Sequence, residues 1–319
     1  MSGISGQVSV TRLSNGEVVC LNDLSVEEMY RLHYDEECFV AEETLAMPPF
    51  SDERNSLLCK GYEFVTEVMD YRFVKETGAS QKIFGAGFGS AKALVKLLRK
   101  RIRTKRPEQT ALCELGVGTG FALSKVLENF GADELQIKGC DISLTTSARE
   151  LDESHPNVEL KEASAYDFIK ELPDSSIDIL YADNVFEHFF PDEAEAIYDE
   201  LVKKLKPDAL LFLIIPNRYI GPGDVSARYL KMGEKARGFH FMEMSFNEVT
   251  DSFKKYGIRN LYCVYYIPKA QKFVLIRSRF LIALKLKFEK LLSKIPIRFI
   301  KYVLLYCGGY HITILQKRG

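Results

Sequence analysis

The sequence contains no closely spaced pair of cysteines. Its seven cysteines are scattered along 319 residues without a CxxC pair and without regular spacing. An odd and irregular set argues against a disulfide framework and favours a reducing compartment. Since no spacing of cysteine and histidine matches a zinc site either, we expect no bound metal.

Targeting patterns and long apolar runs are absent as well. The N-terminus shows no basic–apolar–small signal pattern, and no uncharged apolar run reaches the length of a membrane span. We therefore expect a cytoplasmic protein. The length, together with a hydrophobic content of 46%, allows one large domain with a sizeable core or one domain with a smaller cap.

The net charge of −1 conceals two segments of opposite charge. Residues 17–70 carry fourteen acidic side chains against three basic ones, whereas residues 269–301 carry ten basic side chains against Glu289 alone. A further basic cluster spans residues 99–106. Such runs fit solvated helix faces, and the two long segments equally fit docking on each other, within one chain or across a homodimer.

The first third of the chain has a different sequence pattern from the remainder. Asn15-Gly16 between alternating runs is typical of a hairpin, and Ser25 opens a capping-box pattern that predicts a helix. We expect residues 1–105 to form a mostly helical cap or lid region. Its predicted elements are a hairpin over residues 8–21, helices over about 25–35, 53–75 and 90–103, and a loop over residues 84–89.

From about residue 106 the pattern changes to alternating strands and helices. This alternation is typical of βαβ units with a mainly parallel sheet, whose ligands bind at the carboxyl ends of the strands. We expect residues 106–319 to form one α/β domain. Its predicted strands are 110–115, 135–140, 158–162, 177–182, 209–215, 258–267 and 310–317, and its predicted helices include 121–130, 192–206 and 246–256.

A basic amphipathic insertion, residues 268–308, precedes the last predicted strand. Four apolar residues recur within it at helical spacing, and three lysines form an adjacent stripe. The pattern fits peripheral contact of residues 269–301 with an anionic membrane. It also fits a helix packed on the sheet whose lysines extend to solvent. The apolar residues are Leu284, Phe288, Leu291 and Ile295, and the lysines are Lys287, Lys290 and Lys294.

The turn after the strand at 110–115 carries the clearest chemical signal. In the run ALCELGVGTGFALSK an apolar stretch ends in Glu114, and three glycines follow at alternate positions before a helical pattern. Such a turn lets backbone approach a ligand closely. A dinucleotide site requires GxGxxG, but Phe121 stands at the third glycine position. Glu114 would repel a diphosphate and suits a cationic ligand.

This acid followed by GxGxG resembles the first motif of the class I S-adenosylmethionine-dependent methyltransferase family. Later segments match further landmarks of that family in order: KGCDIS at 138–143, ASA at 163–165, ADNVFEH at 182–188, LKPDALLFL at 205–213 and GFHFMEMS at 238–245. The resemblance covers about residues 110–267 and the last strand. It implies a Rossmann-like, seven-stranded, mainly parallel sheet with helices on both faces.

The resemblance also implies S-adenosylmethionine as the cofactor and methyl donor. It places Asp141 on the ribose hydroxyls and Ile142 beside the adenine. Ser164 replaces the acid that usually receives the adenine amine, and Asp183 ends the fourth strand. The expected donor-contacting residues are Glu114, Gly116, Gly118, Gly120, Asp141, Ile142, Ser164, Ala165, Asp183 and Asn184.

Two histidines are candidates for catalysis. Methyl transfer depends chiefly on alignment, but a hydroxyl acceptor must also lose its proton, which histidine can accept without a large pKa shift. His188 follows the fourth strand, and His240 lies in a loop before a helix, so both flank the donor methyl. We expect His240 or His188 to be the general base. Helix capping, wall packing and a loop hydrogen bond remain alternative roles for them.

The acceptor cannot be read from the sequence directly. The fourth landmark lacks the Asn/Asp-Pro-Pro-Tyr/Phe sequence of enzymes that methylate amino groups of nucleobases, so we expect no nucleic acid partner. We expect methylation of a small molecule, on an oxygen of a sugar, natural product or lipid-linked intermediate. Two alternatives are an NAD(P)-dependent oxidoreductase and a non-catalytic donor-binding or membrane-associated protein.

Overall fold

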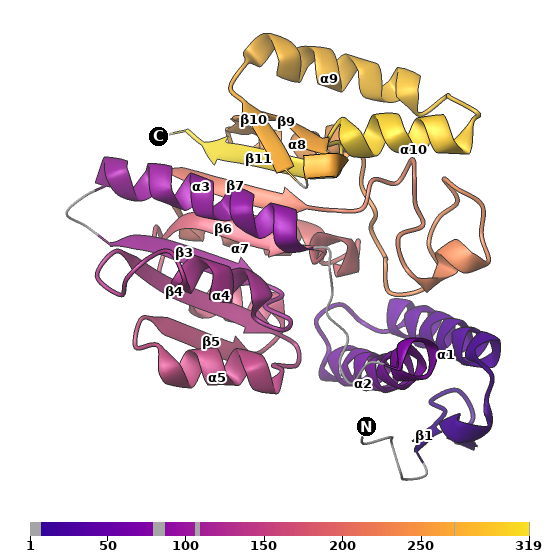
Figure 1. Cartoon of the computed structure of the whole chain (residues 1–319). Coiled ribbons are helices and arrows are strands. Elements are labelled where there is room, and N and C mark those ends of the chain that lie inside the picture. The colour runs from indigo at the N-terminus through magenta and orange to yellow at the C-terminus, as the bar shows by residue number, and fades with distance from the viewer. Residues whose placement is uncertain (1–7, 79–86, 106–108, 271, 319) are drawn as a thin grey trace.

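A seven-stranded sheet occupies the centre of the molecule (Figure 1). The structure is a computed structural model and describes residues 8–78, 87–105, 109–270 and 272–318. The strand order is β5-β4-β3-β6-β7-β11-β8; the first five strands run parallel, and β11 is antiparallel to both of its neighbours. The strands are β3 (Thr110–Leu115), β4 (Leu135–Asp141), β5 (Val158–Glu162), β6 (Ile177–Asp183), β7 (Leu205–Ile214), β8 (Ile258–Asn260) and β11 (Ile312–Lys317).

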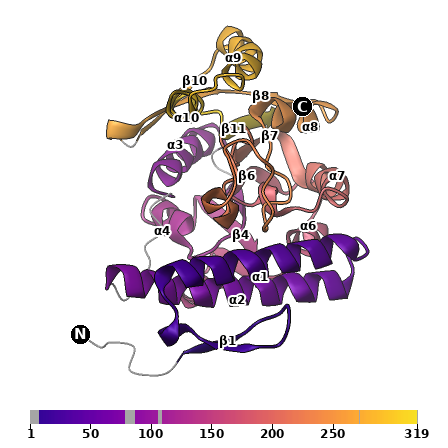
Figure 2. The ribbon, with the colours of Figure 1, turned by 90° about the vertical axis from the view of Figure 1, so that its right-hand side faces the viewer.

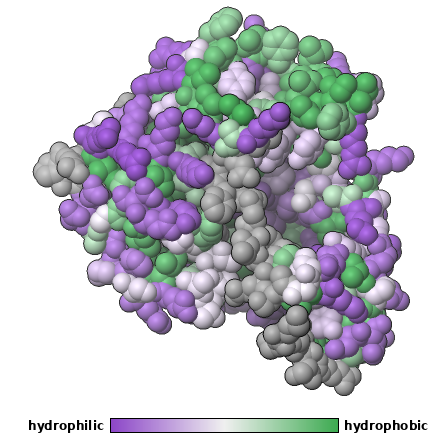
Figure 3. All heavy atoms as spheres, in the orientation of Figure 1, coloured by the Kyte–Doolittle hydropathy of each residue, from purple (hydrophilic) through white to green (hydrophobic). Residues whose placement is uncertain are grey.

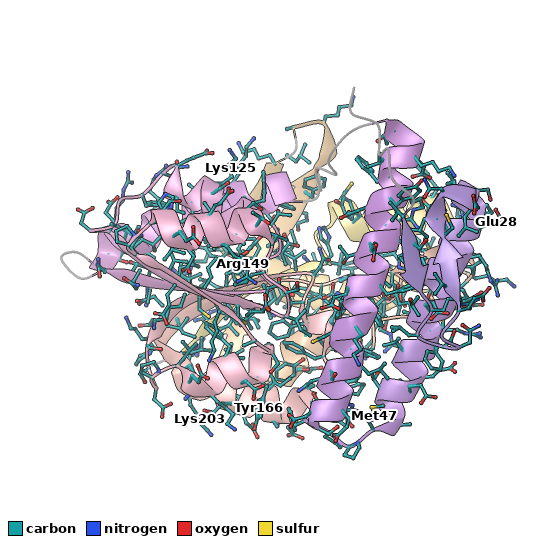
Figure 4. All side chains as sticks on the ribbon, turned by 90° about the horizontal axis from the view of Figure 1, so that it is seen from below. Glu28, Met47, Lys125, Arg149, Tyr166 and Lys203 are labelled. Carbon is teal, nitrogen blue, oxygen red and sulfur yellow. The ribbon has the colours of Figure 1, made fainter. Side chains whose placement is uncertain are left out.

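Helices cover both faces of this sheet, as the sequence predicts. Seen from below, Lys125 of α4 and Arg149 of α5 lie on one side of the sheet, and Tyr166 of α6 and Lys203 of α7 lie on the other (Figure 4). One layer contains α3 (Gly87–Lys105), α4 (Phe121–Leu127) and α5 (Thr146–Ser154), and the other contains α6 (Ala165–Glu171), α7 (Ala194–Lys204) and α8 (Phe246–Lys254).

Successive side chains of each strand point to opposite faces of the sheet and so enter two different cores. In β7, Leu210 and Phe212 enter the core under α3 and α4, whereas Leu211 and Leu213 enter the core under α6 and α7. Each such side chain contributes about 1.5–3 kcal/mol through burial. Chain order reverses around β3, which lies between β4 and β6, so the ligand crevice of the fold lies at the carboxyl ends of β3 and β6.

The N-terminal region is a helical pair beside these strand ends (Figure 2). The predicted hairpin is confirmed as β1 (Ser9–Thr11) and β2 (Val18–Cys20), followed by η1 (Leu21–Asp23). Ser25 and Glu28 form the predicted capping box of α1 (Val26–Ala46), which packs along α2 (Asp52–Thr77).

The predicted end of the first helix near Asp35 is wrong, because α1 continues to Ala46. Its later turns keep burying a stripe against α2, which includes Val40 and Ala41. The chain leaves the helix only before Pro48, where a helical conformation of the preceding residue is disfavoured. The loop predicted for residues 84–89 falls partly outside the described residues, and α3 already includes Gly87.

The insertion forms a separate layer beyond the edge of the sheet. The predicted strand 258–267 is wrong as a single element: β8 joins the main sheet, and β9 (Cys263–Ile267) pairs with β10 (Lys272–Ile276) in a separate antiparallel pair. After η4 (Pro268–Ala270) and β10 come α9 (Arg279–Leu292) and α10 (Arg298–Cys307). Among the helices described here, none has both the length and the apolar character needed to cross a membrane.

Candidate active site

The glycine turn lies where β3 ends and α4 begins. Gly116, Gly118 and Gly120 have φ values of 70°, 55° and 74°, in the left-handed region that glycine tolerates best. A Cβ on Gly116 would lie 2.3 Å from Cγ2 of Val185, whereas a Cβ on Gly118 would meet none of the described atoms within 4 Å. The turn is therefore packed against the segment after β6 and open at Gly118.

Glu114 is a buried carboxyl group at the end of β3. Its Oε2 atom has no hydrogen-bond partner among the described residues. Burial, together with the neighbouring Asp183 and Asp141, raises the pKa of Glu114 well above its usual value. An unpaired buried carboxyl group next to an open glycine turn fits a ligand that is cationic or donates hydrogen bonds.

Asp141, at the end of β4, holds the glycine turn in shape. Its Oδ2 accepts a hydrogen bond from the Gly118 amide at 2.7 Å, and its Oδ1 accepts one from the Ser143 amide at 3.1 Å. Burial raises its pKa even though these bonds favour the charged form. The neighbouring Ile142 packs against the N-terminal core, so the helical pair reaches the donor side of the crevice.

Asp183 ends β6 beside the turn. Its Oδ2 accepts hydrogen bonds from the hydroxyl groups of Ser90 and Tyr181, both at 2.9 Å. Asn184 follows with a φ of 55° and donates from Nδ2 to Oδ1 of Asp183. Ser90 belongs to α3, and the sequence pattern indicates no role for it beyond the start of a helix.

Ser164 is the N-cap of α6. Its hydroxyl oxygen accepts from the Asp167 amide at 3.2 Å, and its hydroxyl donates to the Asp167 carboxylate at 2.7 Å. Ala165 is half-buried against the core on that side of the sheet. The contact of these residues with an adenine stays a prediction.

A second polar cluster lies just beyond β6. Glu187 and His188 belong to η2 (Phe186–His188), and His240 comes from the long segment between β7 and α8, which also contains η3 (Val225–Arg228). Their ligand atoms lie within 4.8 Å of one another, and the two imidazole rings are 4.9 Å apart at their centroids. The structure thus brings together the two histidines that the sequence proposed separately.

His188 is held through its Nδ1 atom. That atom lies 3.0 Å from the carbonyl oxygen of Phe239 and 2.8 Å from the hydroxyl of Tyr62. Because a carbonyl oxygen can only accept, we assign the proton to Nδ1, which leaves Nε2 as an acceptor. Burial, with a smaller contribution from His240, lowers the pKa of His188 to about 3, so this imidazole is neutral.

His240 has a carboxylate partner instead. Its Nδ1 lies 2.8 Å from Oε1 of Glu243. Burial alone would lower the pKa of His240, but the hydrogen bond that its ring donates to Glu243 and the charges of Glu187 and Asp224 raise that pKa above the usual value. Glu243 approaches the backbone so closely that a Cβ on Gly221 would lie 1.9 Å from its Oε2 atom.

The Glu187 carboxyl group is fully buried beside these imidazoles. Neither of its oxygens has a hydrogen-bond partner within the described part of the chain. Burial raises its pKa to about 8, against the opposing influence of His240. One carboxyl group and two imidazoles can form hydrogen bonds with a polar substrate group. The same three side chains are also a ligand set that suits a transition metal. The sequence had suggested no such arrangement.

The N-terminal helices position this cluster, which the sequence did not reveal. Glu37 of α1 accepts a hydrogen bond from the Phe239 amide at 2.7 Å and pairs with His33 at 2.7 Å. Tyr62 of α2 contacts His188. The His33–Glu37 spacing of four was visible in the sequence, but its partner lies about two hundred residues away.

Residues 113–213 match the family described as "Methyltransferase domain". The malonyl-[acyl-carrier protein] O-methyltransferase of Halalkalibacterium halodurans is 25% identical over 48% of this chain and 58% of its own. A tRNA N(3)-cytidine methyltransferase of Gallus gallus is 25% identical over 47% of this chain and 43% of its own. The chain thus spans about half the length of the curated relatives it matches.

Two solved methyltransferase structures are similar to this chain, and the first of them shows the shared fold. The CurJ carbon methyltransferase is 11% identical, with a TM-score of 0.50, over 93% of this chain and 72% of its own. The 1,6-didemethyltoxoflavin-N1-methyltransferase of Burkholderia thailandensis is 12% identical, with a TM-score of 0.49, over 86% of this chain and 94% of its own.

The predicted landmarks, the sheet order and the sequence match agree with one another. The glycine turn and its acids lie at the crevice where the fold binds its ligand. Residues 113–213 contain all of the predicted landmark segments except the one at 238–245. The expectation of a Rossmann-like methyltransferase fold is confirmed. Residues 113–213 match the methyltransferase-domain family, and this part of the chain resembles the class I S-adenosylmethionine-dependent methyltransferases.

Proposed function

We propose that this protein transfers the methyl group of S-adenosylmethionine to a hydroxyl group of a small-molecule acceptor. One observation carries the proposal: a donor cradle at Glu114 and Gly118 lies next to a cluster in which His240 is paired with Glu243. The two parts are joined by the segment after β6, because Val185 packs on Gly116 and Glu187 follows two residues later.

The donor fits the residues around the glycine turn. The unpaired Glu114 carboxyl group offers an acceptor to a cationic ligand, and the open space at Gly118 admits close approach to backbone. Asp141 retains lone pairs for ribose hydroxyls beyond its two backbone bonds. Bound S-adenosylmethionine would supply an electrophilic methyl group. The other predicted contacts, with Ile142, Ser164, Ala165 and Asn184, belong to the same proposal.

His240 is the general base in this proposal. Glu243 orients the ring through Nδ1, which leaves Nε2 to take a proton from the acceptor hydroxyl. The raised pKa makes His240 a stronger base than His188, whose pKa is far too low for this task. Neutral His188 and the Glu187 carboxyl group then orient the acceptor by hydrogen bonds, and alignment supplies much of the rate.

The acceptor is proposed to be a small organic molecule rather than a nucleic acid. The cluster is closed on the side of the helical pair, where Tyr62 and Phe239 have ring centroids 4.7 Å apart, and such aromatic walls suit a small ligand. The names of the curated relatives include both an O-methyltransferase and a tRNA methyltransferase, so they do not decide the acceptor atom.

Calorimetry tests the donor. We expect S-adenosylmethionine and S-adenosylhomocysteine to bind and NAD not to bind, and we expect Asp141→Ala to weaken binding of both. Binding of NAD alone would favour an oxidoreductase. Transfer of labelled methyl to a panel of hydroxylated small molecules then tests catalysis. Tight donor binding without transfer to any of them, or to added tRNA, would favour a non-catalytic donor-binding protein.

A further inference from the structure

The outer layer of the insertion exposes an unusually apolar surface. We call this surface, formed by α9, α10 and their connection, the outer face. Phe280 is 73% exposed and Phe299 is 76% exposed. Apolar residues gather at this end of the molecule, over α9 and α10 (Figure 3). The exposed apolar residues are Phe280, Leu284, Phe288, Leu291, Ile297, Phe299, Ile300, Tyr302, Val303 and Leu304.

The apolar stripe of the insertion, which the sequence also allowed to pack on the sheet, points outward. Of the four residues that define it, Leu284, Phe288 and Leu291 are exposed, and Ile295 is half-buried. The inner side of α9 instead buries Ile282 together with the charged residues Lys285 and Glu289.

Polar bonds explain this orientation of α9. The Lys285 ammonium donates to the carbonyl oxygen of Gly309 at 2.6 Å. The Glu289 carboxylate accepts from the backbone amides of Phe246 and Asn247, both at 2.8 Å, and from the side chain of Asn217 at 2.8 Å. Because these charged groups are paired inside, α9 cannot turn its apolar stripe inward without leaving them unpaired.

The charge that remains on the surface of this segment is entirely basic. Glu289, the one acid among residues 269–301, is buried, and so is Lys285. Of the other nine basic residues, eight are exposed and Lys301 is half-buried. The outer face therefore combines apolar side chains with positive charge that no acid of the segment offsets.

A basic cavity lies at the start of α9. It measures about 280 Å³, and four arginines line it together with Ser278, the N-cap of α9. Its lining contains no acid. Arginine side chains at a helix N-terminus suit a phosphate group. The arginines are Arg259, Arg277, Arg279 and Arg318.

We propose that the outer face docks on a membrane that contains anionic phospholipids, with Phe280 and Phe299 entering the interface and the arginine-lined cavity receiving a headgroup phosphate. Aromatic side chains flanked by lysine and arginine are typical of segments that lie in such an interface. The position of the cavity next to Phe280 in the sequence of α9 places the phosphate site at the border of the apolar surface. This proposal does not depend on methyl transfer.

Vesicle sedimentation of the full chain tests the docking. Phosphatidylcholine vesicles with and without phosphatidylserine are compared at low and high salt. We expect binding to the anionic vesicles alone, weakened by salt because the charges are exposed. Phe280→Ser/Phe299→Ser and Arg277→Gln/Arg279→Gln should each reduce binding at least tenfold. The controls Val18→Ser/Leu45→Ser and Lys60→Gln/Lys170→Gln remove exposed apolar and basic groups elsewhere and should bind as the unchanged chain does.

Two further measurements keep the outcome clear. Circular dichroism and S-adenosylhomocysteine binding of every variant show that each one folds, independently of vesicles. Equal binding by variants and controls, or no binding to anionic vesicles at low salt, would overturn the proposal. A dimer that dissociates in Phe280→Ser/Phe299→Ser, without vesicle binding by the unchanged chain, would instead assign the outer face to a second copy.

Discussion

His240 and Glu243 form the pair on which the proposed proton transfer depends. Replacing His240 by alanine removes the base but none of the residues of the glycine turn. We expect turnover to fall by about 10²- to 10⁴-fold, the usual contribution of a general base, while S-adenosylhomocysteine affinity stays unchanged. His155→Ala, at the C-cap of α5, is the matched control. Full turnover by His240→Ala would leave alignment alone, or a nitrogen acceptor, as the explanation.

The environment of His240 predicts the pH dependence of the reaction. The imidazole acts as a base only when it is neutral, and Glu243, Glu187 and Asp224 raise its pKa above the usual value. Activity should therefore decline on the acid side with an apparent pKa above about 6.5, the usual value for histidine. Glu243→Gln removes one negative charge and should move this limb to lower pH. A profile of kcat/KM against pH checks both, and a limb that Glu243→Gln leaves in place would contradict the pairing.

Glu187 decides between an acceptor site and a metal site. If the cluster serves a hydroxyl acceptor through His240, dialysis against EDTA should leave turnover unchanged. Loss of activity that zinc or manganese restores would instead show that Glu187, His188 and His240 hold a cation. Glu187→Gln distinguishes the two independently, since it would weaken metal binding but keep a hydrogen-bonding group for an acceptor.

The predicted donor residues rest on sequence motifs, because each of them lies at or next to a turn that follows a strand. Glu114, Gly118 and Asp141 depend on local spacing around a turn, and their surroundings fit the predicted donor site. The groups that hold His188 could not be read, since Tyr62 comes from a helix more than one hundred residues away, and so does Glu37, which binds the Phe239 amide. Periodicity within a helix indicates that a side chain is buried, but not which distant group it meets.

At the scale of elements, Arg54 connects α2 to the segment before α7. Its guanidinium is fully buried, forms ion pairs with Glu193 at 2.6 Å and Asp192 at 3.0 Å, and stacks on Phe190 at 4.0 Å. Arg54→Ala should lower the free energy of unfolding by about 3–5 kcal/mol, because it leaves Glu193 buried without its partner.

Urea denaturation measures that loss, and Lys60→Ala on the exposed side of α2 is the control. The control should change stability by less than about 0.5 kcal/mol. A loss from Arg54→Ala as small as that of the control would show that the helical pair is held mainly by its apolar contacts.

The elements show where sequence patterns succeed and where they fail. The capping box at Ser25 located the start of α1, because a cap depends on neighbouring residues. The end of α1 and the division of β8 from β9 depend on packing partners, which the spacing of residues along the sequence does not reveal. For α9 the apolar stripe was identified, but its direction was decided by Lys285 and Glu289, whose partners lie on other elements.

For the whole molecule, the fold was the most readable feature. Alternating strands and helices predicted the parallel sheet, and the acid–glycine turn located its ligand edge at β3. The long cap and the insertion could be predicted only as local elements, without the partners on which they pack. Neither the attachment of the cap through Glu37 and Arg54 nor the outward face of α9 follows from their sequences alone.

The contact between Glu37 and Phe239 links the first helix of the chain to the proposed acceptor site. The same peptide segment offers its amide to α1 and its carbonyl to His188, so a displacement of α1 would reach the imidazole through a single residue. Changes far from the crevice, along the face of α1 that carries Glu37, are therefore expected to retune acceptor preference without altering the donor site.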